Sequence, residues 1–178
     1  NNEIQELLGV FLEQVKVPVI IDADGLNALA ERTDILKKAK VPVVLTPHPG
    51  EMGRLLKEPA AKIQENRLES AGMFAQTYGV WVVLKGYRTV IAGPQGQIYV
   101  NPTGGPALAS AGTGDVLAGM MGALVGQVKE IDIGHALCAA VYLHGLAGEK
   151  VAEEIGEISC KAGDVIEALP KILKGLRE

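Results

Sequence analysis

The sequence predicts a single α/β domain over residues 1–178, in which helices flank a mostly parallel central sheet that carries one antiparallel hairpin. Short apolar runs alternate along the chain with longer stretches of helical periodicity. Two further runs, residues 89–92 and 97–100, flank the sequence Gly-Pro-Gln-Gly, which is typical of a hairpin turn. The 178 residues and the apolar content of 48% are sufficient for a substantial core.

Three buried strands are predicted in the first half of the chain, at residues 17–21, 41–45 and 80–84. Each is a nearly continuous apolar run that ends in a polar residue, as expected of a parallel strand covered on both faces. Residues 63–78 place apolar side chains on one face and predict a helix that leads into the third strand.

The second half of the chain is predicted to be helical. Helix is expected from Val116 onward, and residues 133–151 carry apolar side chains on one face. Gly163 and Pro170 are expected to divide the end of the chain into two helical pieces. Three glycines are expected to allow the helix after Val116 to pack closely on the sheet: Gly119, Gly122 and Gly126.

Composition excludes several classes of function. The net charge of −4 comes from scattered acids and bases, so no basic stripe is available to bind a nucleic acid. Cys138 and Cys160 stand apart, with no spacing typical of a disulfide framework or a metal site, which favours a reducing, cytoplasmic location. No apolar run reaches the length of a membrane span, and no membrane partner is expected.

Polar residues follow each predicted strand, at residues 22–27, 46–51 and 85–89, and a glycine turn at residues 111–115 follows the hairpin. In α/β sheets, ligands bind beyond the carboxyl ends of the strands. We therefore expect the four clusters to converge on one edge and to form a ligand site.

Each cluster alone also has an ordinary structural explanation. Asp24 and Asn27 are suited to cap a helix. Pro47 and Pro49 mark a turn, and a carboxylate such as Glu51 is favourable in the first turn of a helix because of the helix dipole. The convergence of the clusters, rather than any one of them, points to function.

The glycine turn Ala111-Gly112-Thr113-Gly114-Asp115 precedes an apolar run and indicates a phosphate site at the start of a helix. Its backbone N–H groups can point at an anion. A carboxylate beside a phosphate would repel it, so Asp115 is expected to act on a hydroxyl group or a metal beside the phosphate. The alternative is that Asp115 only caps the helix.

Four motifs occur in order along the chain: Asp-Ala-Asp-Gly-Leu-Asn, Thr-Pro-His-Pro-Gly-Glu-Met, Leu-Lys-Gly-x-x-Thr and Gly-Thr-Gly-Asp-Val-Leu-Ala-Gly. Together they resemble the ADP/ATP-dependent NAD(P)H-hydrate dehydratases, a carbohydrate-kinase-related branch of the ribokinase-like superfamily. The resemblance implies a ribokinase-like fold. It also implies a metabolite-repair lyase that dehydrates the S epimer of hydrated NADH or NADPH and consumes ADP or ATP.

The resemblance implies roles for particular residues. Asp115 would be the base that accepts the proton of the ring hydroxyl as this hydroxyl is phosphorylated, before phosphate is eliminated. Mg²⁺ would neutralise phosphate charge. The nucleotide would be bound by Lys85, Gly86, Tyr87, Arg88, Thr89, Gly105, Gly112, Thr113 and Gly114. The hydrate would be bound by His48, Pro49, Gly50 and Glu51 together with Asp115.

The resemblance also implies partners. Family members usually begin with a longer N-terminal half, so this chain is expected to lack part of the domain, and many members carry a separate epimerase domain. A homo-oligomer is expected. Two other functions stay open: a small-molecule kinase of the same superfamily, acting on a vitamin precursor or a sugar, and a non-catalytic nucleotide-binding fragment.

His135 and His144 lie on the predicted helix at residues 133–151 without an acidic partner at an obvious spacing. We expect them to be surface residues or hydrogen-bonded core residues rather than parts of the site.

Overall fold

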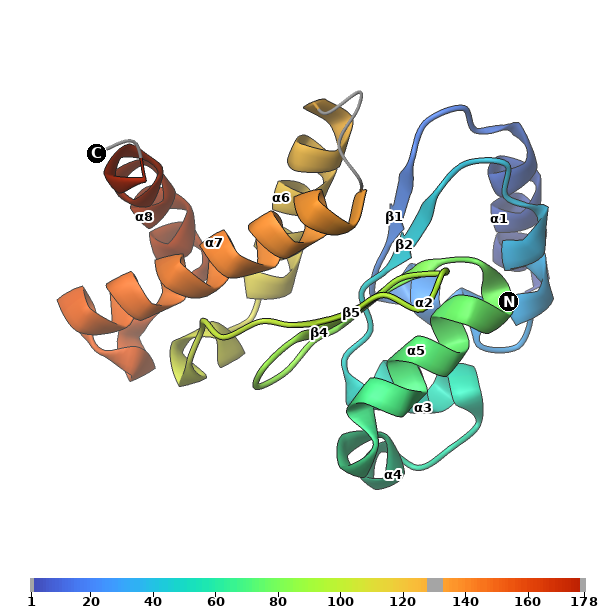
Figure 1. Ribbon diagram of the computed structural model, residues 1–178, viewed down its shortest axis with the longest axis horizontal. Coiled ribbons are helices and arrows are strands. Elements are labelled where there is room, and N and C mark those ends of the chain that lie inside the picture. Colours follow the sequence, from blue (N-terminus) through green and yellow to red (C-terminus); the bar gives the residue numbers. More distant parts are fainter. Residues whose placement is uncertain (1, 128–132, 177–178) are drawn as a thin grey trace. The chain divides into compact units, whose positions relative to one another are not determined.

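The computed structural model describes residues 2–127 and 133–176. The chain divides into two compact units, residues 1–100 and residues 101–178. Figure 1 shows the first unit in blue to green and the second in yellow to red. The two units are described in turn.

The first unit is built on a five-stranded mixed sheet with the strand order β1-β2-β3-β4-β5. The strands are β1 (Val19–Ile21), β2 (Val43–Leu45), β3 (Trp81–Leu84), β4 (Val90–Ala92) and β5 (Ile98–Val100). The pairs β1–β2 and β2–β3 are parallel, whereas β3–β4 and β4–β5 are antiparallel. The parallel strands and the hairpin are therefore as predicted, and the antiparallel pairing of β3 with β4 is added to them.

The first two strands start later than predicted because of the prolines near their starts. Proline has no backbone N–H to donate within a sheet. The structure places Pro18 and Pro42 just before β1 and β2, where the carbonyl oxygen of Pro42 accepts from the N–H of Val19 at 3.0 Å.

Helices of the first unit are α1 (Asn2–Gln14), α2 (Asp24–Leu29), α3 (Pro49–Leu56), α4 (Ala60–Glu65) and α5 (Arg67–Tyr78), with a 3₁₀ helix at Thr33–Lys38. The single helix predicted at residues 63–78 is wrong in one respect: it is divided into α4 and α5. Asn66 separates them with a non-helical φ of −127°. Helix α1 was not predicted, although Leu8 and Leu12, spaced by one turn, pack into the core.

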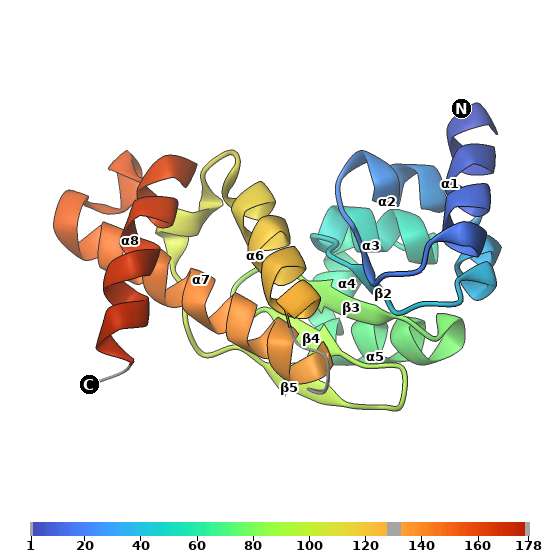
Figure 2. The same cartoon turned by 90° about the horizontal axis from the view of Figure 1, so that it is seen from above.

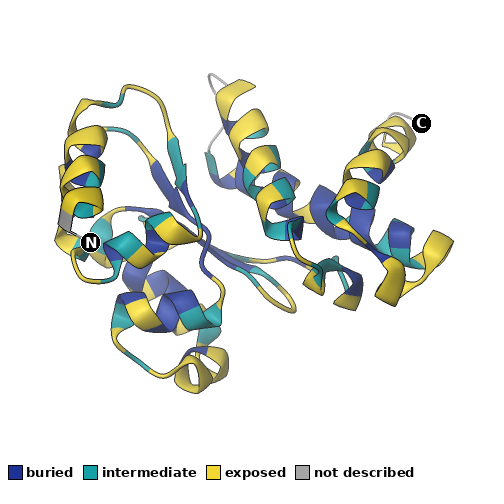
Figure 3. Cartoon of the chain, turned by 180° about the vertical axis from the view of Figure 1, so that it is seen from behind, coloured by how far each residue is buried: buried dark blue, intermediate teal, exposed yellow. Residues whose placement is uncertain are grey.

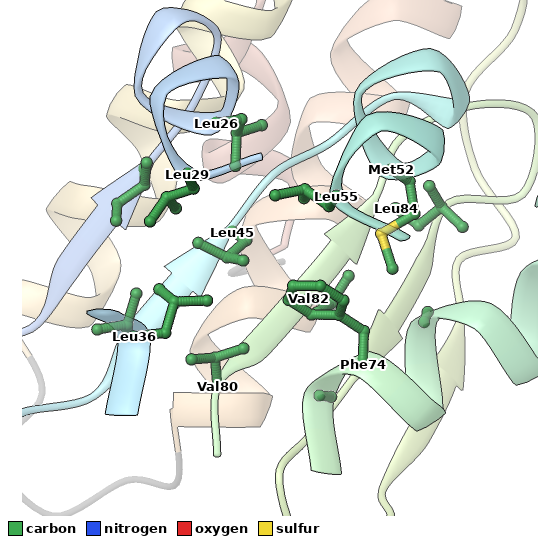
Figure 4. Close-up of a cluster of buried hydrophobic side chains, with 14 of the residues drawn as sticks. Leu26, Leu29, Leu36, Leu45, Met52, Leu55, Phe74, Val80, Val82 and Leu84 are labelled. Atoms are coloured by element: carbon green, nitrogen blue, oxygen red, sulfur yellow. The ribbon is translucent and has the colours of Figure 1, made fainter. Parts of the chain in front are cut away.

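A hydrophobic core lies between the sheet and helices α2, α3 and α5 (Figure 4). Leu26 and Leu29 of α2 pack there with Met52 of α3 and Phe74 of α5, and all four are almost fully buried. Burying a side chain of this size contributes about 1.5–3 kcal/mol. Since α2 and α3 follow directly after β1 and β2, this packing fixes the helix starts at the carboxyl edge of the sheet.

The second unit consists mainly of helices. They are α6 (Thr113–Gln127), α7 (Ile133–Ile155) and α8 (Ala162–Gly175), with 3₁₀ helices at Pro106–Ala109 and Glu157–Ser159. Helix α6 begins at Thr113 rather than at Val116, and the part of the helix prediction that falls on residues 128–132 lies outside the described residues. Figure 2 shows α7 and α8 from above, and their small buried residues form the core of this unit: Ala147, Val151, Val165 and Ala168.

The predicted division of the end of the chain is wrong, because Gly163 and Pro170 both lie inside the single helix α8. Gly163 is in the first turn, where a backbone N–H has no partner within the helix. Pro170 removes the hydrogen bond to the carbonyl of Ile166, but Ile166 is exposed, so water can replace the lost donor. Val165 and Ala168 before the proline and Ile172 after it pack on the same core, and this packing holds the two halves of the helix together.

Figure 3 shows that the strands β2 to β4 are almost entirely buried, whereas the polar segments that follow strands are partly exposed. None of the described helices is long and apolar enough to span a membrane.

Candidate active site

Three of the four predicted clusters lie in the first unit, where Asp22 follows β1, Thr46 follows β2 and Lys85 follows β3. The backbone N–H of Thr46 donates to the carbonyl oxygen of Ile21 at 3.2 Å, and that of Lys85 donates to Pro47 at 2.8 Å. These bonds continue the parallel pairing past the strand ends and bring the three clusters together at one edge. The fourth cluster lies in the second unit, and its convergence with the other three stays a prediction.

An ion pair joins the first and third clusters. Lys85 Nζ donates to Asp22 Oδ1 at 2.8 Å, and the side chains are only 21% and 16% exposed. Asp22 Oδ1 also accepts from the N–H of Ala23, a non-glycine residue with φ +47°. Such a conformation is strained and occurs preferentially at functional sites. The ammonium group of Lys85 is thus engaged within the protein.

In the predicted nucleotide-binding loop at residues 85–89, two residues have a positive φ. Gly86 has φ +140° and Arg88 has φ +56°. Thr89 Oγ1 donates to the carbonyl oxygen of Gly86 at 3.1 Å and closes the loop. Tyr87 is 80% exposed, with the Arg88 guanidinium 5.5 Å from its ring centroid. The loop therefore presents an aromatic face and a cation to the solvent.

Arg67, at the start of α5, supports this loop from below. Its Nη2 donates to the carbonyl oxygen of Leu84 at 2.9 Å, and its Nη1 donates to Gln64 Oε1 at 2.9 Å. A Cβ at Gly86 would lie 2.5 Å from Nη1, so another residue would displace the guanidinium, and the φ of +140° is strained for any L side chain. Burial lowers the pKa of Arg67, yet a guanidinium stays protonated. Arg67 was not among the predicted site residues.

His48 caps helix α3. Its Nδ1 accepts from the N–H groups of Gly50 at 3.0 Å and Glu51 at 3.3 Å, and the Glu51 carboxylate accepts from the N–H of His48 at 2.8 Å. Pro49 occupies the first helical position. This network assigns the imidazole proton to Nε2, because Nδ1 is an acceptor. The structural explanation for Glu51 thus holds. Nε2 of the half-exposed His48 lies 3.6 Å from Glu51 Oε1, too far for a hydrogen bond, and is the imidazole group that can donate to a ligand.

A second polar link at this edge was also not predicted. Arg54 Nε donates to Asn27 Oδ1 at 3.0 Å, and Asn27 Nδ2 reaches Asp24 Oδ1 at 3.4 Å. The capping alternative fails for Asp24 and Asn27, because α2 begins after Ala23 without a side-chain cap.

In the second unit, the glycine turn leads into α6. Gly112 has φ +85°, and the N–H of Val116 donates to its carbonyl oxygen at 3.1 Å. Thr113 is buried, and its Oγ1 lies within hydrogen-bonding distance of the carbonyl oxygens of Leu108 and Ser110. The helix is therefore held at its first residue from two sides.

The amides of Gly114 and Asp115 have no acceptor within the described residues. The carboxylate of Asp115 is exposed and lies in the first turn of α6, and no hydrogen bond joins it to a described backbone N–H. These observations do not support the capping alternative for Asp115. They leave two backbone donors and one carboxylate together at the start of α6.

The segment before the turn is fastened to α7. The N–H of Gly104, which has φ +93°, donates to Glu149 Oε1 at 2.8 Å. Thr103 Oγ1 donates to the carbonyl oxygen of Tyr142 at 2.9 Å. Gly105 is extended and precedes the 3₁₀ helix at Pro106–Ala109. Glu149 and Thr103 were not predicted to take part.

The two helical histidines differ. His135 is exposed, whereas His144 is buried and its Nε2 lies 2.9 Å from the carbonyl oxygen of Thr113. Burial lowers the pKa of His144, and the hydrogen bond to Thr113 opposes this in part. The expectation of a surface residue and a hydrogen-bonded core residue is met, but the acceptor of His144 belongs to the predicted phosphate turn.

Comparisons with known proteins agree with the motifs. A family model described as NAD(P)H-hydrate dehydratase matches residues 1–171. The chain is 50% identical over 173 residues to a bifunctional NAD(P)H-hydrate repair enzyme from Moorella thermoacetica, covering 97% of this chain and 32% of that protein. It is 42% identical over 158 residues to an ADP-dependent (S)-NAD(P)H-hydrate dehydratase from Bacillus subtilis, covering 88% and 54% of the two chains.

Solved structures give the same result. The crystal structure of an ADP/ATP-dependent NAD(P)H-hydrate dehydratase from Bacillus subtilis, co-crystallised with ATP and Mg²⁺, superposes with a TM-score of 0.88 at 40% identity, covering 98% of this chain and 60% of that one. A ribokinase-like superfamily protein from Enterococcus faecalis has a TM-score of 0.79 at 29% identity, with 96% and 58% covered. The ribokinase-like fold is thereby confirmed.

The chain spans about a third of the length of the Moorella protein and about half of the curated Bacillus protein.

Proposed function

Because this chain belongs to the NAD(P)H-hydrate dehydratase family, whose model it matches over residues 1–171, we propose that the protein dehydrates the S epimer of hydrated NADH or NADPH and consumes ADP or ATP in the reaction. The family match over nearly the whole chain is the observation that carries this proposal. The solved relative co-crystallised with ATP and Mg²⁺ supports a nucleotide as co-substrate.

In this proposal, Asp115 is the base. The ring hydroxyl of the hydrate is a poor leaving group. Its oxygen attacks the terminal phosphorus of the nucleotide while Asp115 accepts its proton. As the new O–P bond forms, the bond between the terminal phosphorus and the bridging oxygen of the nucleotide breaks, and AMP or ADP leaves. Phosphate then leaves the ring together with its oxygen, a ring proton is lost, and the reduced nicotinamide is restored. The carboxylate of Asp115 is exposed and makes no hydrogen bond to the residues that the structure describes, which supports this assignment.

The backbone amides at Gly112, Thr113 and Gly114 are proposed to meet the phosphate charge that develops in the transfer. The N–H groups of Gly114 and Asp115, which have no acceptor in the described part of the chain, lie at the positive end of the α6 dipole and support this role. Gly105, in the extended segment before the turn, is proposed to let the nucleotide approach the backbone.

The loop with Lys85, Gly86, Tyr87, Arg88 and Thr89 is proposed to bind the nucleotide. Since the Lys85 ammonium is paired with Asp22, the binding groups would be the loop backbone, the Tyr87 ring and the Arg88 guanidinium. His48 Nε2 is proposed to donate to an oxygen of the hydrate, on a turn shaped by Pro49, Gly50 and Glu51.

Mg²⁺ fits this arrangement as the partner of the nucleotide. No group of three or more His, Cys, Asp or Glu side chains that could hold a metal ion occurs among the described residues. Mg²⁺ keeps several waters and is commonly bound by one or two carboxylates plus substrate phosphates. Asp115, an exposed carboxylate in the phosphate turn, is the residue that would face it, and the ion would supply charge neutralisation at the phosphates.

We further propose that the two units form one domain of the complete protein, that the protein is cytoplasmic and that it forms a homo-oligomer. The name of the Moorella relative, a bifunctional repair enzyme, supports an epimerase domain as a partner activity. No specific feature of the described residues favours a vitamin or sugar kinase, or a fragment that only binds nucleotide.

The test gives the intact polypeptide hydrated NADH, ADP and Mg²⁺ and follows the absorbance of reduced nicotinamide. Recovery of that absorbance with release of inorganic phosphate supports the proposal, and reactions without nucleotide or with the R epimer are the controls. A kinase would instead accumulate a stable phosphate ester. Absence of recovery by a folded protein would contradict the proposal.

A further inference from the structure

We infer that His144 is a positioning residue for the predicted phosphate turn: it fixes the peptide between Thr113 and Gly114, and thereby the direction of the Gly114 N–H. The observation is the contact of its Nε2 with the carbonyl oxygen of Thr113 at 2.9 Å. The catalytic meaning of this contact rests on the proposed function. The structural part of the inference does not.

The geometry of the peptide bond connects the two groups. The carbonyl of Thr113 and the N–H of Gly114 belong to the same planar, trans peptide unit, so they point in opposite directions. A donor that holds the carbonyl oxygen therefore also sets where the N–H points. That N–H has no acceptor within the described residues, and it directs its hydrogen away from the imidazole of His144.

Glycine stands on both sides of Thr113, so a further restraint on this turn reduces its backbone freedom. Gly112 has φ +85°, and glycine backbones lose more conformational freedom on ordering than those of other residues. Thr113 Oγ1 is held by the carbonyl oxygens of Leu108 and Ser110, which restrains the side chain. The peptide unit after Thr113, which the hydroxyl group does not reach, is restrained by the α-helical bond from Leu117 to the carbonyl oxygen of Thr113, and the bond from His144 adds a second restraint at the same oxygen.

Helix α7 is suited to provide the anchor. His144 is only 6% exposed, so its ring has few alternative positions. On the same helix, a Cβ at Gly145 would lie 2.7 Å from the Cβ of Thr103, and Glu149 accepts from the N–H of Gly104. Three positions of α7, residues 144, 145 and 149, thus contact residues 113, 103 and 104, respectively.

The chemistry of His144 agrees with positioning rather than with proton transfer. A carbonyl oxygen only accepts, so Nε2 carries the proton and is engaged. Burial disfavours the charged imidazolium, and the neutral ring still donates from Nε2. His144 therefore acts on the reaction through the turn.

The test compares His144→Phe, which removes the donor, with His144→Gln, whose amide nitrogen replaces Nε2. His135→Phe, at an exposed position of the same helix, is the control. Amide hydrogen exchange of Val116, whose N–H donates to Gly112, reports the first turn of α6, and the amide of Met121 reports the middle of the helix.

We expect His144→Phe to accelerate exchange at Val116 about tenfold or more while Met121 changes little, and to lower kcat about tenfold in the dehydratase assay. His144→Gln should restore both, and His135→Phe should change neither. Unchanged exchange at Val116, or equal acceleration at Val116 and Met121, would overturn the inference. If the parent protein shows no turnover, the proposed function fails while the exchange measurement still decides the role of His144.

A measurement on the parent protein covers the case in which His144→Phe does not fold. Nitrogen NMR of the imidazole distinguishes the two neutral tautomers. A proton on Nε2 supports the inference. A proton on Nδ1 alone overturns it, because Nε2 would then have nothing to donate.

Discussion

At the scale of single residues, Asp115 and Asp164 provide a natural comparison. Both occupy the third position of a helix, Asp115 in α6 and Asp164 in α8. The carboxylate of Asp164 accepts from the N–H of Lys161, the residue before α8, at 2.8 Å. The carboxylate of Asp115 has no such bond to the described backbone. The same residue type at the same helical position thus has a structural bond in one helix and remains available in the other.

We predict that Asp115→Asn lowers turnover by a factor on the order of 10²–10⁴, the usual contribution of a positioned general base. Nucleotide affinity should hold or improve, because a negative charge beside the phosphates is removed. Stability should change little, since no hydrogen bond of the carboxylate is lost. Steady-state kinetics, calorimetric titration with ADP and thermal unfolding measure the three quantities.

Asp164→Asn is the matched control for this prediction. It should keep turnover and lose roughly 0.5–1 kcal/mol of stability through the weakened cap. If Asp115→Asn retained turnover within a few-fold of the parent, or if both substitutions had the same effect, the assignment of Asp115 as base would be refuted.

Stability should depend on pH through His144. The pKa of His144 in the folded protein lies below the ordinary value of 6.5. As the pH falls below 6.5, the imidazole is therefore protonated in the unfolded chain before it is protonated in the folded protein. Stability from this source is complete above pH 6.5 and is lost as the pH falls below it. The unfolding free energy of the parent minus that of His144→Gln should therefore decrease as the pH is lowered from about 7.5 to about 5.5. Urea unfolding at several pH values tests this, with His135→Gln as control. A pH-independent difference would disprove it.

The residue types and spacings predicted the turn at Asp115 and the loop at Lys85, because their constituents are adjacent in sequence. They did not predict Arg54, Arg67 or Glu149. Arg54 bonds a residue 27 positions away, Arg67 one 17 away and Glu149 one 45 away. Periodicity and local spacing describe neighbours along the chain, so contacts that depend on how helices pack are invisible to them.

At the scale of helices, the glycines of α6 and α7 differ in how closely other residues pack against them. Close packing was expected for the glycines of α6, but Gly119 and Gly126 are exposed and a Cβ on either would meet no atom within 4 Å. On α7, Gly145 and Gly148 are buried, and added Cβ atoms would collide with Thr103 and Leu108. The close approach that glycine permits is therefore a property of α7.

We predict opposite effects of alanine in the two helices. Gly119→Ala should stabilise the protein by about 0.5–1 kcal/mol, because alanine reduces the conformational freedom of the unfolded chain and has the higher helix propensity. Gly145→Ala should destabilise it by about 1–3 kcal/mol, because the backbone of Thr103 must move. Thermal and urea unfolding measure both changes. Equal signs for the two substitutions would contradict this account of the helices.

The strands were predictable because buried parallel strands are continuous apolar runs with clear ends. The helix boundaries were less so. The helix breaks at Asn66, where α4 ends and α5 begins, although the apolar pattern predicts one continuous helix. The continuity of α8 through Pro170 depends on core contacts on both sides of the proline. In both cases, tertiary packing overrode the local signal.

At the scale of the whole molecule, each unit has a hydrophobic core of its own, and predicted nucleotide-binding residues occur in both. The loop at residues 85–89 and the turn at residues 112–114 are partly exposed and contain one and two glycines, respectively. A bound ligand restricts the motion of such exposed segments more than it restricts the residues of a packed core, and it adds its binding free energy to the folded state. Binding should therefore be visible in the stability of the folded protein.

We predict that ADP or ATP with Mg²⁺ raises the melting temperature. A ligand that binds only the folded state, present at about 100 times its Kd, adds about 2.7 kcal/mol of stability, and each kcal/mol corresponds to roughly 2–4 °C in a domain of about this size. Shifts of several degrees are thus expected in differential scanning calorimetry. Inorganic phosphate with Mg²⁺ at the same ionic strength is the control and should shift the temperature much less, because it lacks the adenosine part. If saturating nucleotide produced no more stabilisation than phosphate in a folded protein, residues 85–89 and 112–114 would lose their assignment to a nucleotide site, and the dependence of the proposed reaction on ADP or ATP would fail with it.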